Sequence, residues 1–164
     1  MAKYKTIIGR AESIDFVDSL MADIPAKVDT GAYYCSVHAS EIKEVTRKGK
    51  KVLQFKLLGN HPSFPYNRVI EEPNYYSRTV ENSFGHTQER FVVTFKVRIA
   101  GKVFKTEFTL ADRSTKVFPI LLGRILLNKR FMVDTDIAHI DRKVLKEKLT
   151  DWLAKADKDD ELVL

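Results

Sequence analysis

The sequence contains a single cysteine, Cys35, among 164 residues, and it has no long apolar run. A single thiol excludes a disulfide within the chain and favours a reducing compartment. No stretch approaches the roughly 20 apolar residues that a membrane-spanning helix requires. The N-terminal residues also lack an apolar segment long enough for a signal peptide. We therefore expect a cytoplasmic protein without a membrane partner.

The motifs of common nucleotide and metal sites are missing as well. The sequence contains no glycine-rich loop of the Walker type and no His-Glu-x-x-His. No two of its histidines have the helical spacing of zinc ligands: His38, His61, His86 and His139. His38 and His86, with Glu89, are weak metal candidates, and a hydrogen-bonded structural role is the better interpretation of each. We expect no cofactor.

Positive charge exceeds negative charge only moderately. The chain has 28 lysines and arginines against 22 aspartates and glutamates, a formal net charge of +6. These cations are spread along the chain, so we expect a solvated basic surface and no nucleic-acid partner. The same charge is compatible with an acidic peptide or protein. The length fits one domain with its own core.

Short strand patterns occupy most of the chain. The clearest is a hairpin at 91–110, where apolar residues alternate on both sides of a turn at Ala100-Gly101. The segment 10–21 fits either a short helix or a strand with a turn. Further strands and hairpins are expected at 4–9, 24–29, 36–39, 41–58, 117–122 and 131–140. We predict an all-β, β-rich domain over residues 1–140.

Two helices complete the prediction. A short one is expected at 125–128, and a C-terminal one at about 142–156 has apolar residues near one face, which predicts core or dimer contacts: Val144, Leu145, Leu149, Trp152 and Leu153. The last residues form a charged run that we expect to be solvated and frayed. Residues 141–164 are thus interpreted as a C-terminal helix and acidic tail.

The most informative motif is Asp29-Thr30-Gly31-Ala32, which follows the apolar residues of an expected strand. A carboxylate at the end of a buried strand is costly unless its charge is used. Thr30 and Gly31 suit a tight turn that holds this carboxylate in place. The arrangement is that of an aspartic-protease half-site, although an isolated Asp-Thr-Gly is more often an ordinary turn.

A second motif, Leu121-Leu122-Gly123-Arg124, makes the resemblance specific. The pair resembles retropepsin-type aspartic proteases, and the chain is similar to a bacterial family labelled as ATP-dependent zinc proteases and also described as retropepsin-like. The similarity extends from about residue 7 to 140. Its other matching motifs are Ile8-Gly9-Arg10 with Glu12, Ser36, His38-Ala39, Ser83, Gly85-His86, Glu89-Arg90, Phe108-Thr109-Leu110, Asp112-Arg113 and Val133-Asp134.

The resemblance implies a retropepsin-like acid-protease barrel with Asp29, Thr30 and Gly31 at its catalytic centre. Such a mechanism requires two aspartates that share one proton. The chain has one Asp-Thr-Gly, since Asp134-Thr135-Asp136 lacks the glycine, so the second aspartate is expected from another copy in a homodimer. We predict a peptide or amide hydrolase, with acidic, glutamate-rich peptides as candidate substrates by resemblance.

Other residues are assigned supporting roles by the same resemblance. Ala32, Gly123 and Arg124 would support the catalytic loop, with the Arg124 guanidinium as a brace. The polar segment 67–90 falls where retropepsins have their flap, which closes over substrate. Its candidate substrate or flap residues are Ser83, Gly85, His86, Glu89 and Arg90. The alternative is that Glu89 and Arg90 form an ion pair at a strand edge.

Three other functions stay open. The first is a non-catalytic module that binds an acidic peptide or protein on the same fold. The second is a zinc-dependent protease, as the family label states, although neither half of that label has support in the motifs. The third and weakest is a Cys35 and His38 nucleophile, because a free cysteine beside aromatic residues usually fills space in a core.

Overall fold

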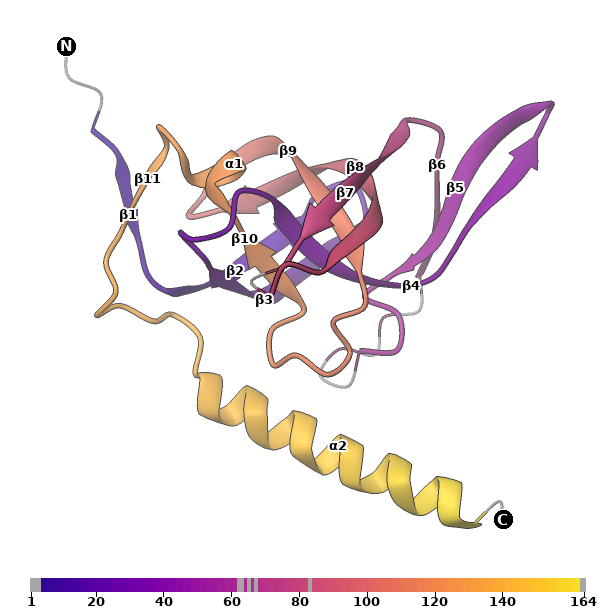
Figure 1. Ribbon diagram of the computed structural model, residues 1–164. Helices are drawn as coiled ribbons and strands as arrows, with labels where there is room; N and C mark the ends of the chain where they lie inside the picture. Colours follow the sequence, from indigo (N-terminus) through magenta and orange to yellow (C-terminus); the bar gives the residue numbers. More distant parts are fainter. Residues whose placement is uncertain (1–3, 62–63, 65, 67, 83, 163–164) are drawn as a thin grey trace.

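In the computed structural model of the chain, six strands close into a mixed β-barrel (Figure 1). In order around the barrel they are β10 (Ile120–Leu122), β3 (Met21–Val28), β2 (Ala11–Phe16), β8 (Thr87–Ile99), β9 (Lys102–Ala111) and β4 (Cys35–Arg47). The structure describes residues 4–61, 64, 66, 68–82 and 84–162, with side chains as far as residue 155. The predicted β-rich barrel class is confirmed.

The short strand β10 closes the barrel. It pairs in parallel with β3, where Leu122 lies opposite Val28, and in antiparallel with β4, where Leu121 lies opposite Ser36. Within the barrel, closure leaves neither β10 nor β3 as a sheet edge. It also brings the end of β3, the end of β10 and the start of β4 to one end of the barrel. The two sequence motifs singled out above meet there.

Aromatic residues fill the centre of the barrel. The rings of Phe16, Phe95 and Phe108 lie 5.2–5.7 Å apart in tilted or edge-on geometry. Along β8, buried and exposed residues alternate from Val93 to Ile99, which is the period of a strand with one face in a core. The predicted hairpin at 91–110 is confirmed and forms β8 and β9.

Three strands extend the sheet beyond the barrel. β5 (Lys50–Leu57) pairs with the second half of β4, and β6 (Arg68–Glu72) pairs with β5. Figure 1 shows the β4–β5 hairpin projecting from one side. Its turn has positive φ at both Lys48 and Gly49, as two-residue hairpin turns require. The third strand, β7 (Tyr75–Glu81), forms a hairpin with the first half of β8.

The segment 10–21, left open above, is a strand followed by a turn. It contains β2 and the turn before β3. Separately, β1 (Thr6–Ile8) pairs in parallel with β11 (Phe131–Val133) and forms a two-stranded sheet. The region expected as the strand 117–122 contributes only β10, although Phe118 is buried beside it.

The prediction of a strand over 131–140 is wrong beyond Val133. Asp134 begins a turn in which its Oδ1 accepts the backbone N–H of Asp136 at 3.0 Å and its carbonyl accepts that of Ile137 at 3.2 Å. Aspartate side chains commonly compete with strand hydrogen bonds in this way. The turn lets the chain pass Gly9, where a Cβ would lie 2.3 Å from the Ile137 carbonyl oxygen.

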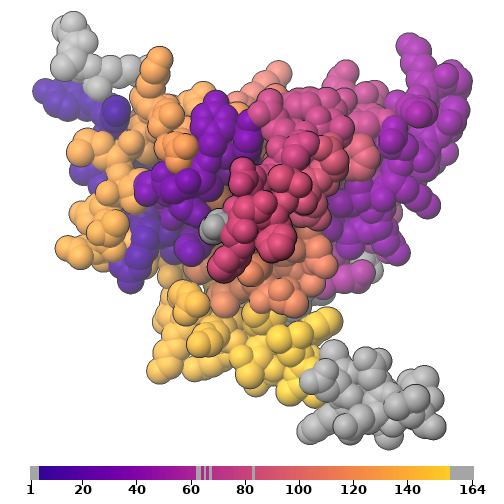
Figure 2. Space-filling model, viewed as in Figure 1, coloured from indigo at the N-terminus to yellow at the C-terminus, as the bar shows by residue number. Residues whose placement is uncertain are grey.

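The described residues form two helices. α1 (Arg124–Leu127) follows β10, close to the predicted 125–128, and α2 (Arg142–Leu162) lies beneath the barrel in Figures 1 and 2. Leu145 of α2 packs with Ala11 and Phe118 of the barrel wall. α2 extends further than predicted, because the acidic residues expected to fray are helical as far as Leu162.

The exposed face of α2 corrects a second expectation. Trp152 and Leu153 are 42% and 38% exposed, so they are not core residues, and the alternative of dimer contacts stays a prediction. They follow Leu149, the last buried residue of α2 among those whose side chains the structure describes. No helix among the described residues is long and apolar enough to cross a membrane.

Candidate active site

The loop after β3 holds Asp29 by backbone and side-chain hydrogen bonds. The Asp29 N–H donates to the Leu122 carbonyl at 2.9 Å, which anchors the residue to β10. Its Oδ1 accepts the N–H of Gly31 at 2.9 Å, and its carbonyl accepts the N–H of Ala32 at 3.3 Å. The carboxylate is partly buried. The turn therefore fixes one carboxylate oxygen, Oδ1, and leaves Oδ2 without a hydrogen bond to the described residues.

Gly123 lets two loops approach one another. A Cβ at this position would lie 2.4 Å from the Tyr34 carbonyl oxygen and 2.6 Å from that of Tyr33. Its N–H donates to Sγ of the buried Cys35 at 3.4 Å. Only glycine permits this contact, since real Cβ atoms do not come so close to backbone. The Leu-Leu-Gly-Arg motif thus packs its backbone directly against the residues after Asp-Thr-Gly.

Arg124 adds side-chain and backbone links between the same loops. Its Nη1 donates to the Thr30 carbonyl at 3.0 Å, and its backbone N–H donates to the Ala32 carbonyl at 2.9 Å. The guanidinium also lies 5.9 Å from the centre of the Tyr33 ring. A planar group with several donors suits this bracing role.

The tip of the β7–β8 hairpin is organised by Asn82. Its Oδ1 accepts the N–H groups of Phe84 and His86 at 2.9 and 3.0 Å, and its own N–H donates to the His86 carbonyl at 2.9 Å. Gly85 lies in this turn with φ of +79°, a conformation that favours glycine. The hairpin tip is therefore a formed turn.

A cavity of about 730 Å³ separates this hairpin from the loop after β3. Figure 2 shows the two segments adjoining on the face turned toward the viewer. The lining comes from both loops and from the barrel end between them: Gly31, Ala32, Tyr33, Tyr34, Ser36, Thr79, Val80, Glu81, Asn82, His86, Thr87, Gln88, Arg90, Thr109, Arg113, Leu121 and Arg124. In position and size it suits a short stretch of peptide.

The family model for RimB-like proteins, described as "Retropepsin-like aspartic endopeptidase RimB", matches residues 7–144. This match includes both motifs, the cavity and the whole barrel. The chain belongs to the RimB-like family.

Several named proteins are similar in sequence to most of this chain. Proteins named "Probable alpha-L-glutamate ligase" from Desulfotalea psychrophila and Shewanella pealeana are 32% and 30% identical over 88% and 82% of it. This chain covers only 31% and 29% of those proteins, so it spans about a third of their length. The crystal structure of Lpg0085, a Legionella pneumophila protein of unknown function (DUF785), has 28% identity and a TM-score of 0.65 over 82% of this chain and 97% of its own.

In this RimB-like chain, some of the site residues predicted from the sequence line the cavity and others do not. Five of them line the cavity: Gly31, Ala32, His86, Arg90 and Arg124. Five described ones do not: Asp29, Thr30, Gly85, Glu89 and Gly123. Ser83 lies outside the described residues. Asp29 lies immediately behind the lining, since its Oδ1 contacts the N–H of Gly31.

Glu89 and Arg90 do not form the ion pair considered above. The Glu89 side chain accepts the hydroxyl of Thr79, its partner across the hairpin. Arg90 donates from Nε to Gln88 at 3.1 Å and from Nη1 to Thr109 at 3.5 Å. Successive residues of a strand point to opposite faces, so only Arg90 reaches the cavity.

Sequence reasoning gave no role to several cavity residues. Arg113 lines the cavity beside Arg90, and burial together with the positive charge of Arg90 lowers the pKa of its guanidinium. Tyr34 lies under the guanidinium of Arg78 from β7, 4.7 Å from its ring centre. Asp112-Arg113 matched the family motif and was the available signal for the arginine. No sequence signal indicated a role for Tyr33 or Tyr34.

Three of the four histidines, His38, His61 and His139, have side chains in structural contacts. His38 is buried; its Nδ1 accepts the N–H of Arg113 at 2.8 Å and its Nε2 donates to the Gly59 carbonyl at 2.8 Å. Burial lowers its pKa. Neither nitrogen of His38 is therefore available to a metal or to Cys35, and burial raises the pKa of that thiol to about 11.

The remaining histidines are separated. His61 lies edge-on to His38 with ring centres 5.3 Å apart, while His139 lies 2.7 Å from the Glu12 carboxylate. His86 is at the hairpin tip. Across the described part of the chain, no three His, Cys, Asp or Glu side chains gather as a metal site would require.

Proposed function

We propose that this chain is an aspartic endopeptidase whose catalytic dyad is formed by Asp29 from each of two copies. The observation that carries the proposal is the loop itself. The Asp29 carboxylate is held by the N–H of Gly31, braced through Arg124 on Thr30, and placed behind a peptide-sized cavity. Each copy supplies one such loop, and the family is described as aspartic endopeptidases.

The chemistry follows from two carboxylates that share one proton. The ionised Asp29 takes a proton from a water molecule as that water attacks the scissile carbonyl carbon. The protonated Asp29 of the other copy gives its proton to the carbonyl oxygen. The tetrahedral diol then collapses: one of its hydroxyls returns a proton to the second Asp29 carboxylate as the C=O bond re-forms, the C–N bond breaks, and the first carboxyl gives its proton to the leaving nitrogen. Thr30 and Arg124 act as positioning residues.

We propose acidic peptides as the substrate class. Three observations support this: the net charge of +6, the arginines Arg90, Arg113 and Arg124 around the cavity, and relatives named as glutamate ligases. Glu81 is the one acidic residue among the described lining residues. A polyglutamate segment would find more complementary than opposing charge in this cavity.

The test compares Asp29→Asn with a matched control, Asp134→Asn. Both substitutions replace an aspartate that holds a turn through Oδ1. We expect Asp29→Asn to abolish hydrolysis of a glutamate-rich peptide and Asp134→Asn to retain it. Equal activity in the two variants would overturn the assignment of Asp29.

The shared dyad has its own test. Wild-type chain is mixed with increasing Asp29→Asn chain at constant total concentration. If each site needs one Asp29 from each copy, mixed dimers are inactive and activity falls with the square of the wild-type fraction. A linear fall, or a monomer in sedimentation at micromolar concentration with substrate present, would contradict it.

A non-catalytic binding module is the second candidate. Asp29 does not line the cavity, whereas the arginines do, and this favours binding over chemistry. In that case Asp29→Asn would leave the affinity for the acidic peptide unchanged and wild-type protein would show no hydrolysis.

A further inference from the structure

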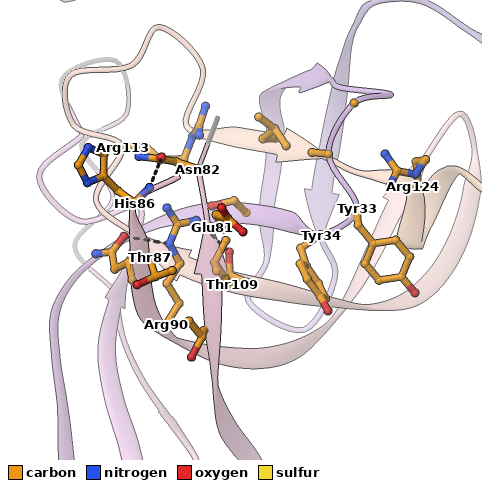
Figure 3. Close-up of a pocket in the computed structure, with 17 residues that line it drawn as sticks. Tyr33, Tyr34, Glu81, Asn82, His86, Thr87, Arg90, Thr109, Arg113 and Arg124 are labelled. Atoms are coloured by element: carbon orange, nitrogen blue, oxygen red, sulfur yellow. Dashed lines mark hydrogen bonds between the residues drawn. The ribbon is translucent and has the colours of Figure 1, made fainter. Parts of the chain in front are cut away.

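Arg90 and Arg113 are half-buried arginines on two different elements that face the same cavity. Arg90 comes from β8, and Arg113 from the loop that follows β9. Burial lowers the pKa of each guanidinium, and the charge of Arg90 contributes to the effect on Arg113. Two cations are therefore held close together in a partly desolvated place. Figure 3 shows both on the same side of the cavity as His86, away from Tyr33 and Arg124.

Neither guanidinium forms a close ion pair with the part of the chain that the structure describes. Among the side chains that the structure describes, no carboxylate oxygen lies within 4.0 Å of either one. Two more exposed arginines do have carboxylate partners, since Arg47 pairs with Glu71 and Arg98 pairs with Asp15. This is the reverse of the usual pattern, in which buried charges are paired and surface charges are left to water.

The contacts that the pair does make leave donors available. Arg113 uses Nε on the Phe118 carbonyl at 3.1 Å, so its two terminal nitrogens make no hydrogen bond to the residues that the structure describes. Arg90 uses Nε and Nη1, which leaves Nη2. These bonds hold each guanidinium in place and leave at least one of its terminal nitrogens able to donate to a ligand. Terminal guanidinium nitrogens bind carboxylates in a planar, often bidentate geometry.

A third group points to a missing ligand. Ser36 lines the same cavity and is 6% exposed, and its Oγ has no hydrogen-bond partner within the described part of the chain. Ser36 lies opposite Thr109 in the β4–β9 pair, and Thr109 accepts from Arg90. A buried hydroxyl without a partner is costly, so a polar ligand that reached it would relieve that cost.

We propose that Arg90 and Arg113 form a subsite that binds one side-chain carboxylate of the substrate, with Ser36 as an additional donor. The assignment rests on the proposed function for its substrate, and it names the residues that select glutamate or aspartate over their amides. Asp29 lies directly behind the cavity lining, where its Oδ1 accepts the N–H of Gly31, and its charge offsets part of the lowering of the Arg113 pKa. We therefore expect the bound carboxylate to belong to a residue close to the scissile bond.

The test measures discrimination between a labelled oligoglutamate peptide and an oligoglutamine peptide of equal length. Binding is measured in the Asp29→Asn background, so that no peptide is consumed. We expect Arg90→Gln and Arg113→Gln each to weaken oligoglutamate binding at least tenfold and to leave oligoglutamine binding unchanged. Arg98→Gln, on the same strand as Arg90 but paired with Asp15, is the control and should retain the full discrimination.

Arg113 also has a structural contact, so a second pair of variants keeps the test valid if Arg113→Gln fails to fold. Arg113→Lys retains the charge and loses the fork, and it should reduce the discrimination ratio with little change in melting temperature. Arg90→Glu should reverse the preference toward an oligolysine peptide. A folded Arg90→Gln or Arg113→Lys protein with the wild-type ratio would overturn the subsite.

Failure of the subsite and failure of the protease give different results. If wild-type protein does not cleave oligoglutamate but binds it with the expected dependence on Arg90 and Arg113, the subsite stands and the catalytic proposal falls. If wild-type protein cleaves it and Arg90→Gln has an unchanged KM and kcat, the protease stands and the subsite is wrong.

Discussion

Arg124 donates a hydrogen bond from its guanidinium to the Thr30 carbonyl, 3.0 Å away, and so ties the residue after Gly123 to the residue after Asp29. We expect Arg124→Ala to lower the free energy of unfolding by about 1 kcal/mol, since the contact is exposed to water. The rate of hydrolysis should fall by more than this small loss of stability explains, because the loop that orients Asp29 loses its brace. Peptide hydrolysis and denaturant unfolding of the same preparation measure the two effects.

The control for this prediction is Arg124→Lys. Lysine retains the charge but offers a single ammonium in place of the planar fork. Stability should be closer to wild type than in Arg124→Ala, whereas activity should stay low. Recovery of full activity in the lysine variant would mean that charge alone is required and that the bracing geometry is not.

Gly123 is predicted to be intolerant of any side chain. Its φ of −98° is accessible to every residue, so the cost of Gly123→Ala comes from contact with the Tyr33 and Tyr34 carbonyls. Overpacking of this kind costs about 3 kcal/mol. We expect a corresponding loss of stability in denaturant titration, with displacement of the loop after β3 and loss of hydrolysis.

Gly49→Ala is the control that shows whether the loss at Gly123 comes from close contact or from the conformational freedom of glycine. Gly49 has φ of +76° and no atom within 4 Å of the position that a Cβ would take. Its replacement should cost only about 1 kcal/mol, from backbone strain, and should leave hydrolysis unchanged. Similar losses in the two variants would show that close contact at Gly123 does not decide its role.

Much of this architecture could be predicted from local patterns. The alternation from Val93 to Ile99 identified β8, and the order of Asp29-Thr30-Gly31 and Leu121–Arg124 placed two loops at one site. Such signals are local or depend on motif order. The division of the chain at about residue 140 stays a prediction, as does the oligomeric state.

What the sequence could not provide depends on contacts between distant residues. Asp134 ended the last strand early because its side chain captured the N–H of Asp136, and alternation alone does not reveal that competition. Arg113 enters the site because β9 ends beside β4, where His38 accepts its N–H. A periodicity argument cannot give the position of a loop residue relative to Arg90 on another strand.

Stability should fall as the solution becomes acidic, because of His61. Burial and the neighbouring His38 lower the pKa of His61 from 6.5 to about 4. Between these values the unfolded chain binds a proton that the folded chain does not, so the free energy of unfolding decreases as pH falls. The expected loss between pH 7 and pH 4 is up to about 3 kcal/mol from this residue.

Denaturant unfolding at a series of pH values measures this slope. His61→Gln can still donate to the Lys116 carbonyl, which lies 3.2 Å from His61 Nε2, but it does not titrate, so the slope should become shallower. His38 also has a lowered pKa, so part of the dependence of stability on pH should remain in His61→Gln. His86→Gln, at an exposed position of the hairpin tip, should leave the slope as in wild type. An unchanged slope in His61→Gln would contradict the prediction.

Cys35 should behave as an inert core residue. It is fully buried, burial raises its pKa to about 11, and its Sγ accepts the Gly123 N–H. The thiolate is the reactive form of cysteine. An aromatic disulfide that labels thiols should therefore react with the native protein at pH 8 only as fast as the protein unfolds, and it should react at once in denaturant. Cys35→Ser retains an acceptor for Gly123 and should preserve hydrolysis. Rapid labelling of the native protein together with loss of hydrolysis in Cys35→Ser would instead favour a cysteine nucleophile and would count against Asp29.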